Sequence, residues 1–135
     1  MVETALSVVI ALPMLLWLIE LSFFFYTLSV VQYASRAGVQ YAVTHGSDSG
    51  SSGCSGPSGG CADGPGANVI HLVQNVAQKS GRAIPASDVK VQWANNTSNP
   101  GDPVAVTVSF TYQPLIDMPF VPLQVSGQAT GHIVY

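Results

Sequence analysis

The first 45 residues are almost free of charge, and this constrains the fold more than any other feature of the sequence. Only Glu3, Glu20 and Arg36 are Asp, Glu, Lys or Arg residues in that stretch. The interval between the two glutamates reads TALSVVIALPMLLWLI, and the interval after Glu20 reads LSFFFYTLSVVQYAS. About 20 consecutive apolar residues suffice for a helix to span a bilayer. We therefore expect a membrane-compatible helix, with Glu20 as its one costly interruption.

The same stretch has the composition of one long helix. No glycine precedes Gly38, and Pro13 is its only proline. A helix over residues 3–44 would be roughly 60 Å long, about twice the thickness of the bilayer core. The pair His45-Gly46 supplies a C-terminal stop. Because proline removes one backbone hydrogen bond, the sequence predicts a kink or local unwinding at Pro13.

A removable signal peptide is the first alternative for this segment. Such a peptide needs a basic start and a short apolar core followed by a cleavage site. Here no Lys or Arg precedes Arg36, and the apolar run continues into a helical pattern. We therefore expect a retained helix. The missing basic start leads us to expect that a leader has been removed, which would make Met1 a mature residue.

The second half of the helix has a different pattern. Small and aromatic residues recur at a spacing of three to four, which predicts one apolar stripe packed against a soluble head: Tyr33, Ala34, Ala37, Tyr41 and Ala42. Three polar residues, Gln32, Arg36 and Gln40, are expected on another face.

Residues 46–66 are rich in glycine and serine and cannot form a packed element of their own. They hold the only two cysteines, Cys54 and Cys61. An intramolecular disulfide in an oxidising compartment is the leading interpretation, with free thiols as the alternative. A metal site would need more ligands, and a redox pair would need a two-residue gap. We expect the loop to face solvent, with serines available for O-glycosylation: Ser47, Ser49, Ser51, Ser52, Ser55 and Ser58.

The remainder of the chain predicts a small head of one helix and a sheet. Residues 67–80 form an amphipathic pattern with Asn68 as candidate N-cap and Gly81 just after the end. Its buried stripe is expected to consist of Val69, Val73, Val76 and Ala77. Strict alternation over 88–93, 104–112 and 123–133 predicts half-buried antiparallel strands.

The predicted fold class is therefore α+β. A long N-terminal hydrophobic helix packs on a small head that contains one helix and an antiparallel sheet of three or more strands. The second half of the long helix supplies the cover for the apolar face of the sheet. The expected units are the helix at 1–45, the Gly/Ser-rich disulfide loop at 46–66 and the head at 67–135.

The sequence contains no arrangement that predicts catalysis, a cofactor or a metal ion. His45, His71 and His132 are far apart and lack ligand spacing. No serine lies in a nucleophile elbow, and no lysine follows the glycine-rich run as in a phosphate loop. We expect a protein that is not an enzyme. Nucleic-acid binding is also excluded, because four scattered cations are too few for a run of phosphates: Arg36, Lys79, Arg82 and Lys90.

The two helix carboxylates are the residues most expected to matter for assembly. Glu3 either complements the helix dipole or pairs with the N-terminal ammonium of a neighbouring subunit. Glu20 must be protonated, bonded to a hydroxyl such as that of Tyr26 or Ser22, or paired with a cation. Arg36 is 16 residues away, about 24 Å along the axis, so it can reach only the Glu20 of a staggered neighbour.

Three segments resemble the pilins, and within them the TadE-like family of tight-adherence (Flp-type) pilus systems. They are VETALSVVIALPMLLWLIELSFFFY at 2–26, ASRAGVQYAVTHG at 34–46, and the closing VAVTVSFTYQPLI and LQVSGQATGHIVY. The first is similar to the family's VEFALVLPLLLLLL-type start. The second is similar to an A-A-R-x-G-x-x-Y-A segment, and the third to a V-x-V-x-Y-x-Y strand followed by a final alternating strand.

This resemblance implies a precursor in the cytoplasmic membrane, cleavage by a prepilin peptidase, and extraction by pilus assembly machinery into an extracellular filament of identical subunits. The chain departs from the family because two residues fewer precede the glutamate at position 3. Either cleavage falls elsewhere or the mature chain extends beyond Met1. A minor pseudopilin, or a single-pass accessory protein that never polymerises, is the alternative.

A structural pilin would use the long helix to pack with copies of itself, driven by the hydrophobic effect. Subunit assembly is then expected to depend on Glu3, Pro13, Glu20 and Arg36, with Pro13 allowing the helix bundle to bend. Packing in the filament core is expected from Leu6, Val9, Ile10, Leu16, Trp17, Phe23 and Phe24.

Overall fold

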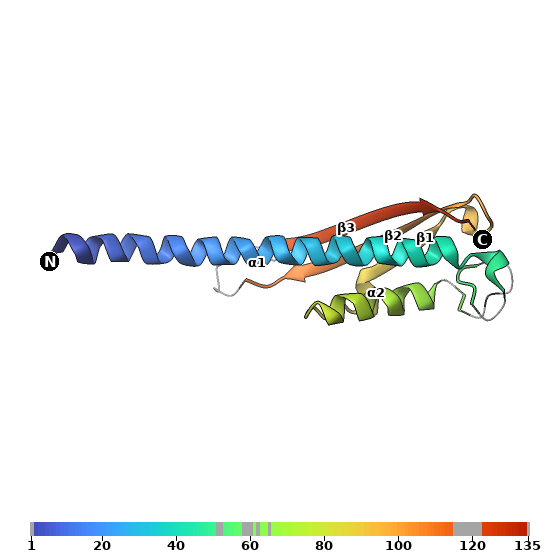
Figure 1. Ribbon diagram of the computed structural model, residues 1–135, viewed down its shortest axis with the longest axis horizontal. Coiled ribbons are helices and arrows are strands. Elements are labelled where there is room, and N and C mark those ends of the chain that lie inside the picture. Colours follow the sequence, from blue (N-terminus) through green and yellow to red (C-terminus); the bar gives the residue numbers. More distant parts are fainter. Residues whose placement is uncertain are drawn as a thin grey trace.

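The structure is a computed structural model that describes residues 2–50, 53–57, 61, 63–64, 66–114 and 123–134. Its main elements are the helices α1 (Val2–Thr44) and α2 (Ala67–Lys79) and the strands β1 (Val89–Trp93), β2 (Pro103–Tyr112) and β3 (Leu123–His132). Figure 1 shows the second half of α1 packed in the head, while the first half projects beyond it as an arm. The predicted α+β fold class is confirmed.

Helix α1 is continuous from Val2 to Thr44, so its predicted length and its end before His45-Gly46 are confirmed. The predicted local unwinding at Pro13 is wrong. Pro13 lies inside the helix, and the ribbon in Figure 1 runs straight through this part of the arm. A proline removes one bond from the backbone ladder, and the long apolar residues on either side favour the helical conformation.

The three strands form an antiparallel sheet in the order β1-β2-β3. Val89 pairs with Val108, and Val108 pairs in turn with Gly127, so the three strands are aligned in a continuous register. The alternation seen in the sequence matches the burial along β2, where Val104, Val106 and Val108 are buried. One face of the sheet therefore faces the core, as predicted.

Both helices lie on this buried face. Helix α1 contacts β2 and β3, whereas α2 contacts α1 and β1. The predicted cover of the sheet by the second half of α1 is thus confirmed. Val31, Val69, Val73, Val104 and Val106 meet in the core with almost no exposed surface.

The buried stripe of α1 differs in part from the predicted one. Ala34 and Ala42 are buried, but Tyr33 is 64% exposed and Tyr41 only partly buried. The buried residues are mostly small or β-branched: Thr27, Val30, Val31, Ala34, Ser35, Gly38, Val39 and Ala42. A tyrosine does not fit between α1 and a sheet that approaches this closely. The polar residues Gln32, Arg36 and Gln40 are exposed, as expected.

Two glycines allow this close approach. A Cβ atom on Gly127 of β3 would lie 3.1 Å from backbone atoms of Val31 and Gln32 in α1. A Cβ atom on Gly38 would lie 2.7 Å from Val73 Cγ2 of α2. At Gly127 the obstructing atoms belong to the helix backbone, which cannot move aside as a side chain can.

Helix α2 confirms the predicted buried stripe at Val69, Val73 and Ala77, whereas Val76 is only partly buried. Its start differs from the prediction, because the N-cap position is held by Gly66 rather than by Asn68. Its end is as predicted: Gly81 has a φ of 74°, and its amide donates to the carbonyl of Gln78.

Replacing Gly127 with valine should therefore destabilise the head. The larger side chain pushes β3 away from α1, and overpacking of this kind costs about 1–3 kcal/mol. Chemical denaturation of the detergent-solubilised protein measures the change. The neighbouring Ser126→Ala variant, at an exposed position of the same strand, is the matched control. Equal stability of the two variants would contradict this close packing.

Candidate assembly interface

The arm of α1, residues 2–19, is an uncovered apolar surface. Every residue of this segment is exposed, including Leu6 at 63%, Val9 at 68% and Trp17 at 63%. By its length and composition, helix α1 is long and apolar enough to cross a membrane. At 1.5 Å per residue the arm is about 27 Å long, close to the thickness of a bilayer core. An apolar surface of this extent marks an interaction site.

The residues predicted to pack in a filament core fall into two groups. Leu6, Val9, Ile10, Leu16 and Trp17 lie on the exposed arm, and Phe23, 44% exposed, lies just after it. The structure places Phe24 differently. Its partly buried ring lies edge-on to the ring of Tyr112, with the centroids 5.6 Å apart. Within this chain Phe24 packs in the head, because the head-facing side of α1 passes through this position.

The arm meets the head at Glu20. The hydroxyl of Tyr112, at the end of β2, donates to Glu20 Oε1 over 2.6 Å. Tyr112 is only 5% exposed, and Phe24 closes one side of its ring. A hydrogen bond to a carboxylate is short and strong in such surroundings. This bond ties the last strand position before the β2–β3 connection to the helix at the point where the arm begins.

The sequence predicted the kind of group that satisfies Glu20, but not the residue. The hydroxyl of Ser22 donates to the carbonyl of Leu18, and that of Tyr26 donates to the carbonyl of Ser80. Tyr112 lies 92 residues away in the chain. Its alternation in β2 predicted that it faces the core. Nothing local to either residue predicted which helix residue it would meet.

Burial raises the pKa of Tyr112 from its ordinary value of 10.0 to about 12, and its bond to Glu20 adds to the shift. The nearby negative charge of Glu20 acts in the same direction, and Arg82 opposes it. The phenol therefore keeps its proton well above neutral pH and stays a hydrogen-bond donor.

The loop at 46–66 is attached to the head more firmly than its composition predicted. Cys54 and Cys61 form the predicted disulfide, with their Cα atoms 5.3 Å apart. Cys54 is 3% exposed and Ser55 is fully buried, so this part of the loop does not face solvent. A Cβ on Gly56 would lie 3.2 Å from the Trp93 ring, which shows that the loop packs on the end of β1.

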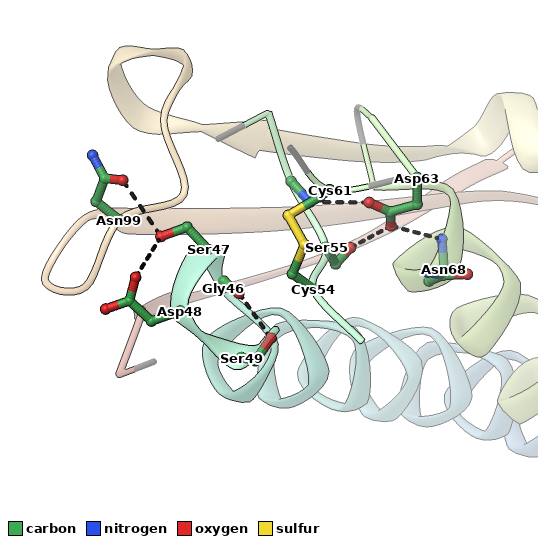
Figure 2. The surroundings of a disulfide bond; sticks show 11 residues. Gly46, Ser47, Asp48, Ser49, Cys54, Ser55, Cys61, Asp63, Asn68 and Asn99 are labelled. Atoms are coloured by element: carbon green, nitrogen blue, oxygen red, sulfur yellow. Dashed lines mark hydrogen bonds between the residues drawn. A yellow bond between two sulfur atoms is a disulfide. The ribbon is translucent and has the colours of Figure 1, made fainter. Parts of the chain in front are cut away.

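Asp63 connects the loop to α2 (Figure 2). Its carboxylate accepts hydrogen bonds from the Ser55 hydroxyl at 2.6 Å and from the amides of Gly56 and Asn68 at 3.2 Å. A negative charge at the N-terminal end of a helix also complements the helix dipole. Asp63 thus satisfies the helix start that Asn68 was predicted to cap with its own side chain.

The serines proposed for glycosylation differ in accessibility. Ser55 is buried and bonded to Asp63, so it offers no free hydroxyl. Ser49 is exposed, and its hydroxyl donates to the carbonyl of Gly46. Ser47 is partly buried, with its hydroxyl near Asp48 and Asn99 (Figure 2). The other three, Ser51, Ser52 and Ser58, lie outside the described residues.

Two charged side chains of α1 have no hydrogen-bond or ion-pair partner within the described part of the chain: those of Glu3 and Arg36. Glu3 lies near the tip of the arm, and Arg36 lies on the exposed face of the second half. Glu20, by contrast, is bonded to Tyr112 in the same chain. Pairing of Glu20 with Arg36 of a neighbour stays a prediction.

Among the described residues, no group of three or more His, Cys, Asp or Glu side chains is placed to hold a metal ion. His71 and His132 are exposed, and the ring of His45 stacks on Tyr41 with centroids 4.0 Å apart. Comparison with family models, with curated proteins and with solved structures finds no match for this chain. The exposure of residues 2–19 and the Glu20–Tyr112 bond make the uncovered arm and its junction with the head the candidate site.

Replacing Tyr112 with phenylalanine should weaken this junction. The variant keeps the ring packing on Phe24 but removes the donor to Glu20. Loss of a hydrogen bond to a charged group costs about 1.5–3 kcal/mol. The free energy of unfolding measures the loss, and Tyr33→Phe, at an exposed tyrosine, should change it little. Similar effects of the two substitutions would contradict the assigned role of Tyr112.

The raised pKa of Tyr112 also predicts a pH dependence. Between about pH 10 and pH 12 the folded protein keeps a proton that the unfolded chain has lost. The stabilisation is therefore complete below pH 10 and is lost as the pH rises through 12. The difference in unfolding free energy between wild type and Tyr112→Phe, measured from pH 8 to pH 12, should shrink across that window. A constant difference would contradict the shift.

Proposed function

We propose that this chain is a structural pilin subunit of the TadE-like, tight-adherence type. It is held in the cytoplasmic membrane by α1 before assembly and polymerises through the arm into an extracellular filament used for surface attachment. One observation carries the proposal: residues 2–19 are uncovered and, apart from Glu3, Thr4 and Ser7, apolar, whereas one side of the same helix is buried in the head from Thr27 to Ala42.

An uncovered apolar arm cannot remain in water, and two environments satisfy it. A bilayer of matching thickness accommodates the single chain. Outside the membrane, parallel arms of many copies remove the same surface from water, which the hydrophobic effect strongly favours. A helix that is apolar all round suits both environments. A helix that only anchored a soluble domain would need no continuous rigid connection to the core of that domain.

The head has the features that a filament coat requires. The arm and the core share one unbroken helix, and the Glu20–Tyr112 bond fixes the head at their junction. The Cys54–Cys61 disulfide suits an oxidising compartment outside the cytoplasm. On this proposal a prepilin peptidase and pilus assembly machinery are the partners during biogenesis, and other copies of the chain are the partners in the filament.

Electron microscopy of material sheared from cells that express the chain tests the proposal. We expect filaments that an antibody against the head decorates along their whole length. Finding the chain only in the membrane fraction would contradict the proposal and favour a single-pass accessory protein. Decoration restricted to a filament tip would favour a minor pseudopilin.

Shortening two side chains of the arm should impair filament assembly without impairing membrane insertion. The double variant Val9→Ala/Ile10→Ala keeps an apolar, membrane-compatible helix but removes packing volume from two exposed positions. An Ile→Ala change at a packed position costs about 2–5 kcal/mol, so we expect filament yield to fall by about tenfold or more. Val134→Ala, at an exposed position on the head, is the control. Unchanged yield with both variants would contradict packing through the arm.

A further inference from the structure

An apolar groove of about 570 Å³ lies between the end of α1 and α2. Its apolar wall includes Ala37, Tyr41 and Val43 of α1 and Leu72 and Val76 of α2, with Gln40 and Thr44 also contributing to its lining. Along α1 the groove covers residues 37–44, about 10 Å or two helical turns. This apolar surface lies on the head, far from the arm.

Arg36 comes one residue before Ala37, the first residue of α1 that lines this groove. It lies one turn before Gln40 on the same exposed face of α1. It is the only cation of α1, and its guanidinium has no partner within the described part of the chain. The surface therefore presents a charge followed by two apolar turns, in the N-to-C direction of α1.

The tip of the arm has the complementary arrangement, a negative charge followed by an uncharged segment. Glu3 carries a negative charge, and residues 4–11, TALSVVIA, follow it without any charge for two turns. Every residue of this segment is exposed. Copies that leave one membrane share one orientation, so their α1 helices run parallel. A parallel copy displaced by 33 residues, about 50 Å, brings Glu3 level with Arg36 and its apolar turns level with the groove.

We propose that Glu3 of one copy pairs with Arg36 of a second copy, while residues 4–11 of the first pack in the groove between α1 and α2 of the second. This inference rests on the proposed function and specifies the contact between copies along the filament. A carboxylate that leaves water with an apolar helix must find a cation or donor. The guanidinium of Arg36 can bind a carboxylate through two parallel hydrogen bonds, and Arg36 adjoins in sequence the groove in which residues 4–11 would pack.

The other cations of the chain fit this contact less well. Arg82 lies over the ring of Phe110, 5.9 Å from its centroid. Lys79 lies at the end of α2 that is near Tyr26, because the carbonyl of the next residue, Ser80, accepts a hydrogen bond from the Tyr26 hydroxyl. Tyr26 is about three turns of α1 before the groove, so Lys79 is distant from it along α1. Lys90 is exposed on β1, at a position that alternates away from the core. Arg36 alone combines a free charge with the adjoining groove.

Disulfide cross-linking in assembled filaments tests the contact directly. In the variant Glu3→Cys/Arg36→Cys the two new thiols are about 50 Å apart in one chain, so they can join only different copies. We expect a ladder of covalent multimers on a non-reducing gel. The control Glu3→Cys/Lys90→Cys carries the same arm cysteine and should give no ladder. Filaments without a ladder, or equal ladders from both variants, would overturn the inference.

Charge reversal supplies a second readout that needs no new cysteine. We expect Arg36→Glu alone to lower filament yield by about tenfold or more, since it places two carboxylates together. The double variant Glu3→Arg/Arg36→Glu should restore most of that loss. Full yield with Arg36→Glu, or no rescue by the double variant, would overturn the pairing while leaving the pilin proposal standing. Absence of filaments from the wild-type chain would instead overturn the proposed function.

Discussion

One helix must satisfy two different surroundings along its length, and the rest of the structure follows from this constraint. Over residues 2–19 helix α1 has no cover within the chain, and its surface is apolar except at Glu3, Thr4 and Ser7. Further along, the side of α1 that faces the sheet carries small and β-branched residues, while the opposite side carries Gln32, Arg36 and Gln40. Because the helix is unbroken between the two parts, any force on the arm passes directly into the core of the head.

The junction between the two parts is held by a polar contact in an apolar setting. Glu20 would be costly at this position without a partner, and the buried phenol of Tyr112 supplies one. The contact also joins the helix to the end of β2, next to the packing of α1 against β2, β3 and α2. At the opposite end of the head, the disulfide loop and Asp63 connect the end of α1 to the start of α2. The head is thus attached to α1 near the middle of the helix, at Glu20, and again at its C-terminal end.

The regular elements were predictable because their signals are local. The uncharged run predicts α1, and the alternation over β2 and β3 predicts both the strands and their buried faces. Other features depend on distant parts of the chain. The sequence did not predict that Gly38 would lie close to α2 and Gly127 close to α1. Nor did it predict that Tyr112 would contact Glu20. Composition alone predicted an exposed loop, but packing on Trp93 and the three hydrogen bonds to Asp63 bury Cys54 and Ser55. The local unwinding expected at Pro13 is absent because one missing hydrogen bond does not outweigh the helical preference of its neighbours.

On the proposed function, the arm of α1 leaves the lipid bilayer and packs against other copies of the chain. Electron cryo-microscopy of the sheared filaments, at a resolution that shows side chains, tests it most directly. We expect a filament of parallel α1 helices in which residues 2–19 are buried against neighbouring copies. A filament in which residues 2–19 stay exposed, or the absence of any filament built from this chain, would contradict this proposal.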